Sequence, residues 1–273
     1  MIQYSFYPTD TRLSEYLFSY GMIEVPKGNT VPLMSPPNGL TGFLIRVKSG
    51  ADARLVATIK NDNPIGHQPS YVIGQITYPI NGYATGPLTF MVVFFQPLGM
   101  YQLFGGNMNR LANTSMDLFD FLGKEKAAAL MKELLAADDA SYQVGVLNNF
   151  FLQQKVTDSC DNEKRVLDII HQAKGNITIK EMEESLSISR RTLERYFQEK
   201  VGISPKVYAQ IFRFKCAIQY LEANPNTKWA DLTYDNGFFD QSHMIRYFKE
   251  YLQVSPNNLV KVDMALVNYL LRN

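Results

Sequence analysis

The chain is poor in the residues from which disulfide frameworks and metal centres are built. Its 273 residues include two cysteines, Cys160 and Cys216, and three histidines. Two cysteines cannot make a disulfide framework or a four-thiolate zinc site, so we expect a reducing compartment. A metal site on neighbouring strands needs two or three histidines and a glutamate, whereas His67 is the only histidine of the first half. The sequence therefore predicts no metal and no other cofactor.

Long hydrophobic runs are also absent. The longest apolar stretch, residues 88–95, has eight residues with one threonine, whereas a membrane-spanning helix needs about 20. The first eight residues lack the basic and apolar regions of a secretion signal. We therefore expect a cytoplasmic protein without a membrane partner.

Neither sign of charge is in excess. Lysine and arginine number 27 and the acidic residues 26, which gives a net charge of +1. This balance excludes a polybasic, histone-like protein but allows a local basic face, because recognition depends on where the charges lie. The first half also lacks a nucleophile elbow, a Walker loop and a Cys–His pair, and its Gly105-Gly106 is typical of a turn. The sequence predicts no enzyme.

The first half has the pattern of strands separated by turns. Runs rich in β-branched and aromatic residues predict strands at 42–47, 55–59, 71–76, 79–83 and 88–95. Their spacing of about ten residues is typical of a β-sandwich or barrel. After residue 115 apolar residues recur at helical spacing, and a second helical stretch covers 144–152. The first of these helical stretches carries Leu118, Leu122, Leu130, Leu134 and Leu135.

Two features of this half allow more than one interpretation. The helices between 118 and 135 either face a partner or pack back onto their own sheet. An aromatic cluster forms either the core or the wall of a small-molecule pocket, and the sequence names no ligand; its members are Phe90, Phe94, Phe95, Tyr101 and Phe104.

The second half repeats itself at an offset of 51 residues. Arg195-Tyr196-Phe197 matches Arg246-Tyr247-Phe248, and Ser204-Pro205 matches Ser255-Pro256. A solenoid needs at least three repeats, so two copies indicate two similar supersecondary units instead.

The first unit begins with an amphipathic helix over 162–174 that Gly175 ends. Thr178 and Glu181 form a capping box, which starts a short helix through Leu186.

After a turn at 187–188, Ser189 caps a second helix that runs to Lys200. Two short helices joined by a tight turn make a helix-turn-helix. We expect the second helix to bury Leu193, Tyr196 and Phe197 and to direct outward Arg190, Arg191, Glu194 and Arg195.

The outward arginines suit the major groove of DNA. Arginine can donate two hydrogen bonds to guanine, worth about 1–3 kcal/mol of base discrimination. Arg191 and Arg195 lie four residues apart on one side of the helix, and Arg190 at its start reaches a base or a phosphate. The alternative is a merely solvated charged face. The capped helix before it and the repeat favour DNA.

The second unit follows the same plan. Thr227 is predicted to cap a helix that contains Trp229, and Gly237 turns the chain. Asp240 then caps a second reading helix over 240–251, with a buried stripe of Met244, Tyr247, Phe248 and Tyr251.

The outward set of this helix also suits DNA. Glutamine can pair with adenine, isoleucine can touch a thymine methyl, and lysine suits phosphate. His243 allows two interpretations. It either contacts DNA, with phosphate favoured over a base, or is only a polar surface residue. The remaining members of the set are Gln241, Ser242, Ile245, Arg246 and Lys249.

One long helix connects the two units. It opens at Ser204-Pro205, with proline at its first position, and continues to Asn224-Pro225. Nearly twenty residues span about 30 Å, close to the ~34 Å between successive major grooves on one side of DNA. Such a connector would place both reading helices in successive grooves. Cys216 on this helix is predicted to be a small core residue.

Residues 162–262 resemble the DNA-binding domain of the AraC/XylS family of bacterial transcription regulators. The resemblance rests on Ser189-x-x-x-Leu193-x-Arg195-x-Phe197, Gly202-Ile203-Ser204-Pro205, Gly237-Phe238-Phe239-Asp240-Gln241-Ser242-His243, Arg246-x-Phe248-Lys249 and Ser255-Pro256. It implies seven helices with two helix-turn-helix units, and DNA contacts at Arg190, Arg191, Glu194, Arg195, Gln241, Ser242, Ile245 and Arg246. Gln253, Thr233 and Trp229 depart from the family pattern, which affects packing of the second unit more than its reading face.

The first half more weakly resembles the β-rich domain of unassigned function found ahead of some AraC-type modules, through Pro36-Pro37-Asn38-Gly39 and Phe95-Gln96-Pro97-Leu98-Gly99. We therefore predict a multidomain α+β chain with a sensory or dimerisation-type domain at 1–155 and an all-α DNA-binding domain at 160–262. A helical extension at 263–273 either packs on that domain or serves self-association.

The sequence thus predicts a sequence-specific transcription regulator that binds double-stranded DNA. RNA polymerase, a small-molecule effector and a second copy of the chain are further candidate partners. The alternative is an enzyme or protein-interaction domain that carries an accessory DNA-binding module.

Overall fold

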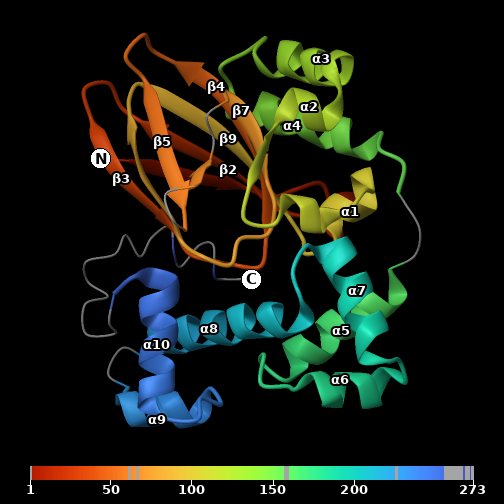
Figure 1. Cartoon of the computed structure of the whole chain (residues 1–273). Helices are drawn as coiled ribbons and strands as arrows, with labels where there is room; N and C mark the ends of the chain where they lie inside the picture. The colour runs from red at the N-terminus through yellow and green to blue at the C-terminus, as the bar shows by residue number, and fades with distance from the viewer. Residues whose placement is uncertain are drawn as a thin grey trace.

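A computed structural model gives the fold of the chain and describes residues 2–60, 63–65, 68–156, 160–224, 227–254, 267 and 271. Strands fill most of the first half and helices the second, as predicted (Figure 1). Among the described residues no helix is long and apolar enough to cross a membrane. The same residues hold no cluster of three or more potential metal ligands. His67, Ser255-Pro256 and most of the extension at 263–273 lie outside the described residues.

The strands form two antiparallel sheets. The six-stranded sheet has the order β1-β2-β9-β4-β7-β10 and the four-stranded sheet the order β3-β8-β5-β6. Their bounds are β1 Gln3–Tyr7, β2 Leu17–Val25, β3 Thr30–Ser35, β4 Thr41–Ser49, β5 Arg54–Ile59, β6 Asn63–Ile65, β7 Ser70–Ile73, β8 Ile80–Thr85, β9 Leu88–Phe95 and β10 Ser115–Asp117. All five predicted strands are present. The two sheets face each other and form a sandwich, as the spacing of the predicted strands indicated.

Strand β9 explains the longest apolar run. All eight of its residues are buried, because both faces of this central strand are covered. Phe90 and Val92 pack between the two sheets, whereas Met91 and Val93 pack under helices on the other side. A strand buried on both faces has no polar side to show, so its sequence loses the usual alternation.

Strand β7 ends at Ile73, three residues earlier than predicted. A Cβ atom on Gly74 would lie 2.1 Å from the carbonyl oxygen of Leu111, so only glycine allows this close approach of the two backbones. Leu111 belongs to η2, a 3₁₀ helix at Met108–Leu111.

Helices cover the outer face of the six-stranded sheet (Figure 1). They are η1 Thr11–Leu13, α1 Gly99–Phe104, α2 Leu118–Leu122, α3 Lys124–Leu134 and α4 Ala140–Leu152. Leu118, Leu130 and Leu134 are buried against the sheet, which favours packing on the sheet over a partner-facing pair. Leu135, which was predicted in the same helical pattern, follows the last residue of α3 and is 53% exposed.

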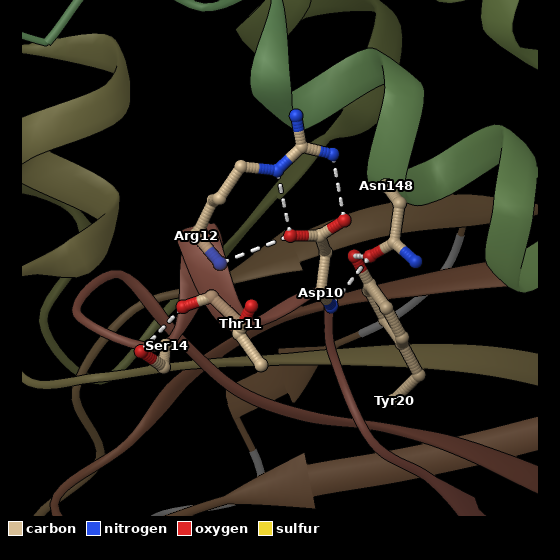
Figure 2. Close-up of polar contacts among 6 residues, drawn as sticks. All are labelled: Asp10, Thr11, Arg12, Ser14, Tyr20 and Asn148. Atoms are coloured by element: carbon tan, nitrogen blue, oxygen red, sulfur yellow. Dashed lines mark hydrogen bonds and ion pairs between the residues drawn. The ribbon is translucent and has the colours of Figure 1, made fainter.

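Figure 2 shows how α4 is tied to the start of the chain. The side-chain oxygen of Asn148 accepts hydrogen bonds from the hydroxyl of Tyr20, at 2.9 Å, and from the backbone of Asp10, at 3.1 Å. Arg12 donates to the Asp10 carboxylate, which lowers the pKa of that carboxyl group to about 2. These polar contacts fix α4 on the sheet beside the apolar core.

The second half contains six helices with described bounds. They are α5 Asp161–Gln172, α6 Ile179–Leu186, α7 Arg190–Val201, α8 Pro205–Ala223, α9 Trp229–Asp235 and α10 Gln241–Leu252. Val267 and Leu271 of the predicted extension are also helical and buried in the same core. Burial of these two residues favours packing as the role of the extension.

Lys215 on α8 is a buried cation. It is 4% exposed, and no described carboxylate forms an ion pair with it. Burial in an apolar core lowers the pKa of its ammonium group to about 8. Between pH 8 and about 10.5 the unfolded chain binds this proton and the folded chain does not, so the free energy of unfolding rises with pH in that window.

Replacing Lys215 by methionine should therefore stabilise the chain at pH 7. We expect Lys215→Met to raise the free energy of unfolding by about 1–3 kcal/mol, because it removes a charge from the core and keeps the side-chain volume. Urea unfolding at a series of pH values tests this. The gain must shrink between pH 8 and 10.5, and a gain that is constant with pH would contradict the assignment.

Candidate nucleic-acid interface

The first unit begins with the predicted capping box. The Thr178 hydroxyl accepts from the backbone of Glu181 at 3.2 Å, and the Glu181 carboxylate accepts from the backbone of Thr178 at 2.7 Å. The hydrogen bond from the Thr178 side chain also lowers the pKa of Glu181. Helix α6 ends at Ser187, whose φ of 55° makes the tight turn toward α7.

Helix α7 starts at the predicted cap. The Ser189 hydroxyl accepts from the backbone of Thr192 at 3.3 Å. The buried residues of α7 are Leu193, Phe197 and Val201, which follow one another at intervals of four residues and so lie on one side of the helix.

Tyr196 was placed in the buried stripe wrongly. It is 38% exposed, since it flanks the line of Leu193 and Phe197 instead of lying on it. The guanidinium carbon of Arg195 lies 4.5 Å from the centre of the Tyr196 ring. The tyrosine therefore supports the arginine on the outer surface.

The outward face of α7 carries three exposed arginines. One of them forms a described ion pair and the other two do not. Arg190 donates to the carboxylate of Glu194 at 3.0 Å, four residues later. Arg191 and Arg195 are exposed and belong to no described ion pair. The pair of Arg190 and Glu194 was not foreseen from the sequence, although its i, i+4 spacing was available.

The start of the second unit differs from the prediction. Helix α9 is preceded by Lys228, whose side chain makes no cap contact, so Thr227 is not its cap. Gly237 has the expected positive φ, 66°, and Phe238 is buried beneath the turn. The Asp240 carboxylate accepts from the backbone of His243 at 2.7 Å and caps α10 as predicted.

Helix α10 buries the predicted stripe of Met244, Tyr247, Phe248 and Tyr251. On its other side Gln241, Ser242, Arg246 and Lys249 are exposed, and Ile245 is half-buried. The predicted outward set is thus assembled on one surface of the second unit.

His243 serves the turn before α10. Its Nδ1 accepts from the backbone of Phe239 at 3.4 Å, and its ring packs edge-on against Tyr247 with 5.1 Å between ring centres. The ring is half-buried, and Nε2 is its other nitrogen. Phe239 itself is 91% exposed, a feature that sequence reasoning missed.

Helix α8 joins the two units (Figure 1). The Ser204 hydroxyl caps it by accepting from the backbone of Val207 at 3.3 Å, and Pro205 is its first residue, as predicted. Its 19 residues correspond to about 28 Å. Cys216 on this helix is half-buried and so is not the core residue expected.

Arg213 in the middle of α8 touches both units. Its Nη2 donates to the carbonyl oxygen of Gly175 at 2.8 Å, and its Nη1 faces the carbonyl oxygen of Gly237 at 3.4 Å. Gly175 ends the first helix of one unit, and Gly237 forms the turn of the other. The planar guanidinium reaches both carbonyl groups because its donors form a fork. This contact was not predicted, since no motif marks it.

The outward face of α7 lies beside the first half of the chain. Asn107 and Asn109 at η2 form one wall of a groove of about 560 Å³, and Arg191, Arg195 and Gln198 lie on the other wall. Gln241, Ser242 and Arg246 of α10 do not line this groove. On α10 it is Lys249 that faces the first half, in a separate groove of about 300 Å³ with Lys60 and Tyr78.

Replacing Arg213 by lysine should loosen the join between the units. Lysine presents one ammonium group and cannot serve two carbonyl groups in this geometry, so we expect Arg213→Lys to lower the free energy of unfolding by about 1–3 kcal/mol. Arg165→Lys, an exposed arginine on α5, is the matched control and should change it by less than about 0.5 kcal/mol. Equal urea midpoints for the two variants would refute the role of Arg213.

Comparisons with known proteins agree with this geometry. Residues 182–261 match the family described as "Helix-turn-helix domain". The chain is 26% identical over 161 residues to the Msm operon regulatory protein of Streptococcus mutans, an alignment that covers 57% of each chain. It is 26% identical over 96 residues to an uncharacterized HTH-type transcriptional regulator of Haemophilus influenzae, which covers 35% of this chain and 32% of the relative.

Similar solved structures include ToxT from Vibrio cholerae, at 13% identity with a TM-score of 0.48, over 95% of this chain and 97% of that chain. A structure of unsaturated fatty acid-bound ToxT is similar at 13% identity with a TM-score of 0.46, over 97% of both chains. The chain spans little more than half the length of the Streptococcus relative and a third of the Haemophilus relative. The family match confirms a helix-turn-helix domain in the second half of the chain, as the resemblance read from the sequence implied.

Proposed function

We propose that the chain is a transcription regulator that inserts α7 and α10 into successive major grooves of promoter DNA. The observation that carries the proposal is the arrangement of the two reading helices. Each is the second helix of a capped helix-turn-helix unit, each has a basic outward face, and they lie at opposite ends of α8 (Figure 1).

The length of the connector supports binding in two grooves. Helix α8 spans about 28 Å, and each reading helix adds its own width beyond the ends of α8. Successive major grooves on one face of DNA are about 34 Å apart. Arg213, which binds both units, keeps this spacing fixed and so lowers the entropy lost on binding.

The outward residues divide into base-reading and backbone-binding roles. Arg195, Arg191 and Arg246 suit guanine, because an unpaired guanidinium can donate twice to one base edge. Gln241 suits adenine, and Ile245 a thymine methyl group. We assign contacts with phosphate to Arg190, Ser242, His243 and Lys249. Glu194 can instead accept a hydrogen bond from the amino group of cytosine.

Removing either central arginine should weaken specific binding. We expect Arg195→Ala and Arg246→Ala each to cost about 1–3 kcal/mol of binding free energy and to relax the preference for one base pair. The measurement is a titration of the full chain with a duplex that it selects from a random-sequence library. Arg165→Ala, which removes a charge of the same domain away from both reading faces, should lose far less.

The affinity should also fall steeply as salt is raised, since phosphate contacts release counterions. Loss of affinity in Arg165→Ala equal to that in Arg195→Ala and Arg246→Ala would show that total charge, not these two faces, binds DNA. That result would end the assignment of the reading helices.

We further propose that the first half modulates DNA binding through a small ligand. The support is a cavity of about 140 Å³ between the two sheets. Its described lining has no charged residue and consists mainly of aliphatic and aromatic side chains, among them Leu44, Phe90 and Val92. An apolar cavity of about 150 Å³ in another protein stays dry and binds benzene. The lining therefore favours an apolar molecule about as large as one ring.

The position of the cavity supports an effect on the second half. Met34 lines the cavity and also packs against the core that holds the DNA-binding helices. In the same segment, a Cβ atom on Gly39 would lie 3.1 Å from the ring of Tyr208 on α8. A ligand that moves the segment 34–39 would thus press on α8.

A ring-sized apolar probe should stabilise the full chain. We expect saturating benzene to raise the midpoint of thermal unfolding by a few degrees, because a ligand that binds only the folded state stabilises that state. Leu44→Phe fills the cavity and should abolish the shift. Ile45→Leu, at the next residue but on the opposite face of β4, should keep it. A shift with glucose as large as that with benzene would contradict an apolar site.

RNA polymerase and a second copy of the chain belong to the same proposal as further partners. The alternative of an enzyme with an accessory DNA-binding module gains no support from the cysteines. Burial raises the pKa of both the Cys160 and the Cys216 thiol, whereas a reactive cysteine needs a lowered pKa.

A further inference from the structure

The reading face of α7 shares a groove with the first half of the chain. One wall of the groove comes from α7, with Arg191, Arg195 and Gln198, and the opposite wall from Asn107 and Asn109 at η2. The arginines with which the proposed function reads DNA are thus on the same side of α7 as another segment of the same chain.

The short helix η2 is a rigid part of the first half. Met108 and Leu111 are 5% and 4% exposed and belong to the core under the six-stranded sheet. The next turn is held as well, because the Asn113 side chain accepts from the backbone of Thr77 at 2.8 Å. Therefore η2 cannot swing aside alone, and it moves only with the domain that carries it.

Close contacts hold this wall against the end of α7. A Cβ atom on Gly202, which ends α7, would lie 3.2 Å from the carbonyl oxygen of Met108. The Lys200 ammonium lies 5.6 Å from the centre of the Tyr101 ring in the first half. Leu98, also from the first half, is buried within the core of the second. The groove is therefore closed at one end by direct packing.

This arrangement does not admit DNA on α7. A reading helix must enter a major groove about 12 Å wide and 8.5 Å deep, with a phosphate backbone on each side of it. One of those backbones would have to occupy the space of η2. Helix α10 faces the first half as well, but only with its C-terminal end, where Lys249 lines a separate groove with Lys60 and Tyr78. Its Gln241 and Arg246 lie outside both grooves.

We propose that η2 is an intramolecular partner of the α7 reading face and competes with DNA for it. The proposal rests on the proposed function for the role of α7. In the arrangement described η2 blocks the entry of α7 into a major groove, and binding by both units requires the two halves to separate at η2.

An exposed ion pair makes this separation feasible. Lys164 on α5 and Glu15, which precedes β2, form a hydrogen-bonded ion pair between the halves, and both side chains are about half exposed. Exposed ion pairs add little stability and weaken with salt. The polar walls of the groove likewise exchange protein contacts for water at low cost. Exposure of Leu98 opposes the separation, and the binding of DNA has to offset it.

A reversible cross-link across the groove tests the competition. Asn109→Cys with Gln198→Cys places one thiol on each wall, at residues without an assigned DNA contact. A short, cleavable bis-maleimide joins them in the full chain. We expect the cross-linked chain to bind its library-selected duplex at least tenfold more weakly, and cleavage of the linker to restore the affinity. Each single-cysteine variant, treated alike, should be unaffected and also controls for Cys160 and Cys216.

The outcomes separate this inference from the proposed function. Unchanged affinity in the cross-linked chain would overturn the competition, and so would a failure of the two thiols to cross-link in the absence of DNA. Selection of no duplex by the untreated chain would instead reject the proposed function. In that case cross-linking without DNA still reports whether η2 lies on α7.

Discussion

The fork of Arg213 is the contact on which the DNA-binding half depends. The two units also share one apolar core along α8, in which Phe214 packs edge-on against Phe248 and Tyr251 of α10. The guanidinium binds the carbonyl groups of Gly175 and Gly237, one in each unit, from the middle of α8. Backbone carbonyl groups do not rotate away as side chains do. The two reading helices are therefore held at one separation, which a DNA helix with a fixed repeat requires.

Shared apolar contacts also join the two halves of the chain. Leu98 and Met34 come from the strand-rich half but pack in or against the core of the helical half. The apolar cavity and the groove at η2 are both close to this junction, through Met34 in one case and Met108 in the other. A ligand that reshapes the junction would thus alter the freedom of α7 to meet DNA. The proposals of ligand modulation and of competition by η2 are in this way two parts of one equilibrium.

Local chemistry made much of the fold predictable. The capping box of Thr178, the cap at Asp240 and the proline that opens α8 all act within three or four residues, so their geometry follows from spacing. Tyr196 was misjudged because it flanks the line of Leu193 and Phe197, and Thr227 because α9 begins one residue too late for it to act as the cap. The Arg213 fork and the groove at η2 join distant segments, and a single sequence carries no signal for such pairs. The domain boundaries at residues 155, 160 and 262 remain predictions.

The central claim is that one chain presents two reading helices to successive grooves on one face of DNA. Methylation interference on a selected duplex tests it directly, because methyl groups at guanine N7 block contacts in the major groove. The account predicts two clusters of interfering guanines whose centres are about 10–10.5 base pairs apart. A single cluster, or two clusters about half a turn apart and so on opposite faces, would contradict it.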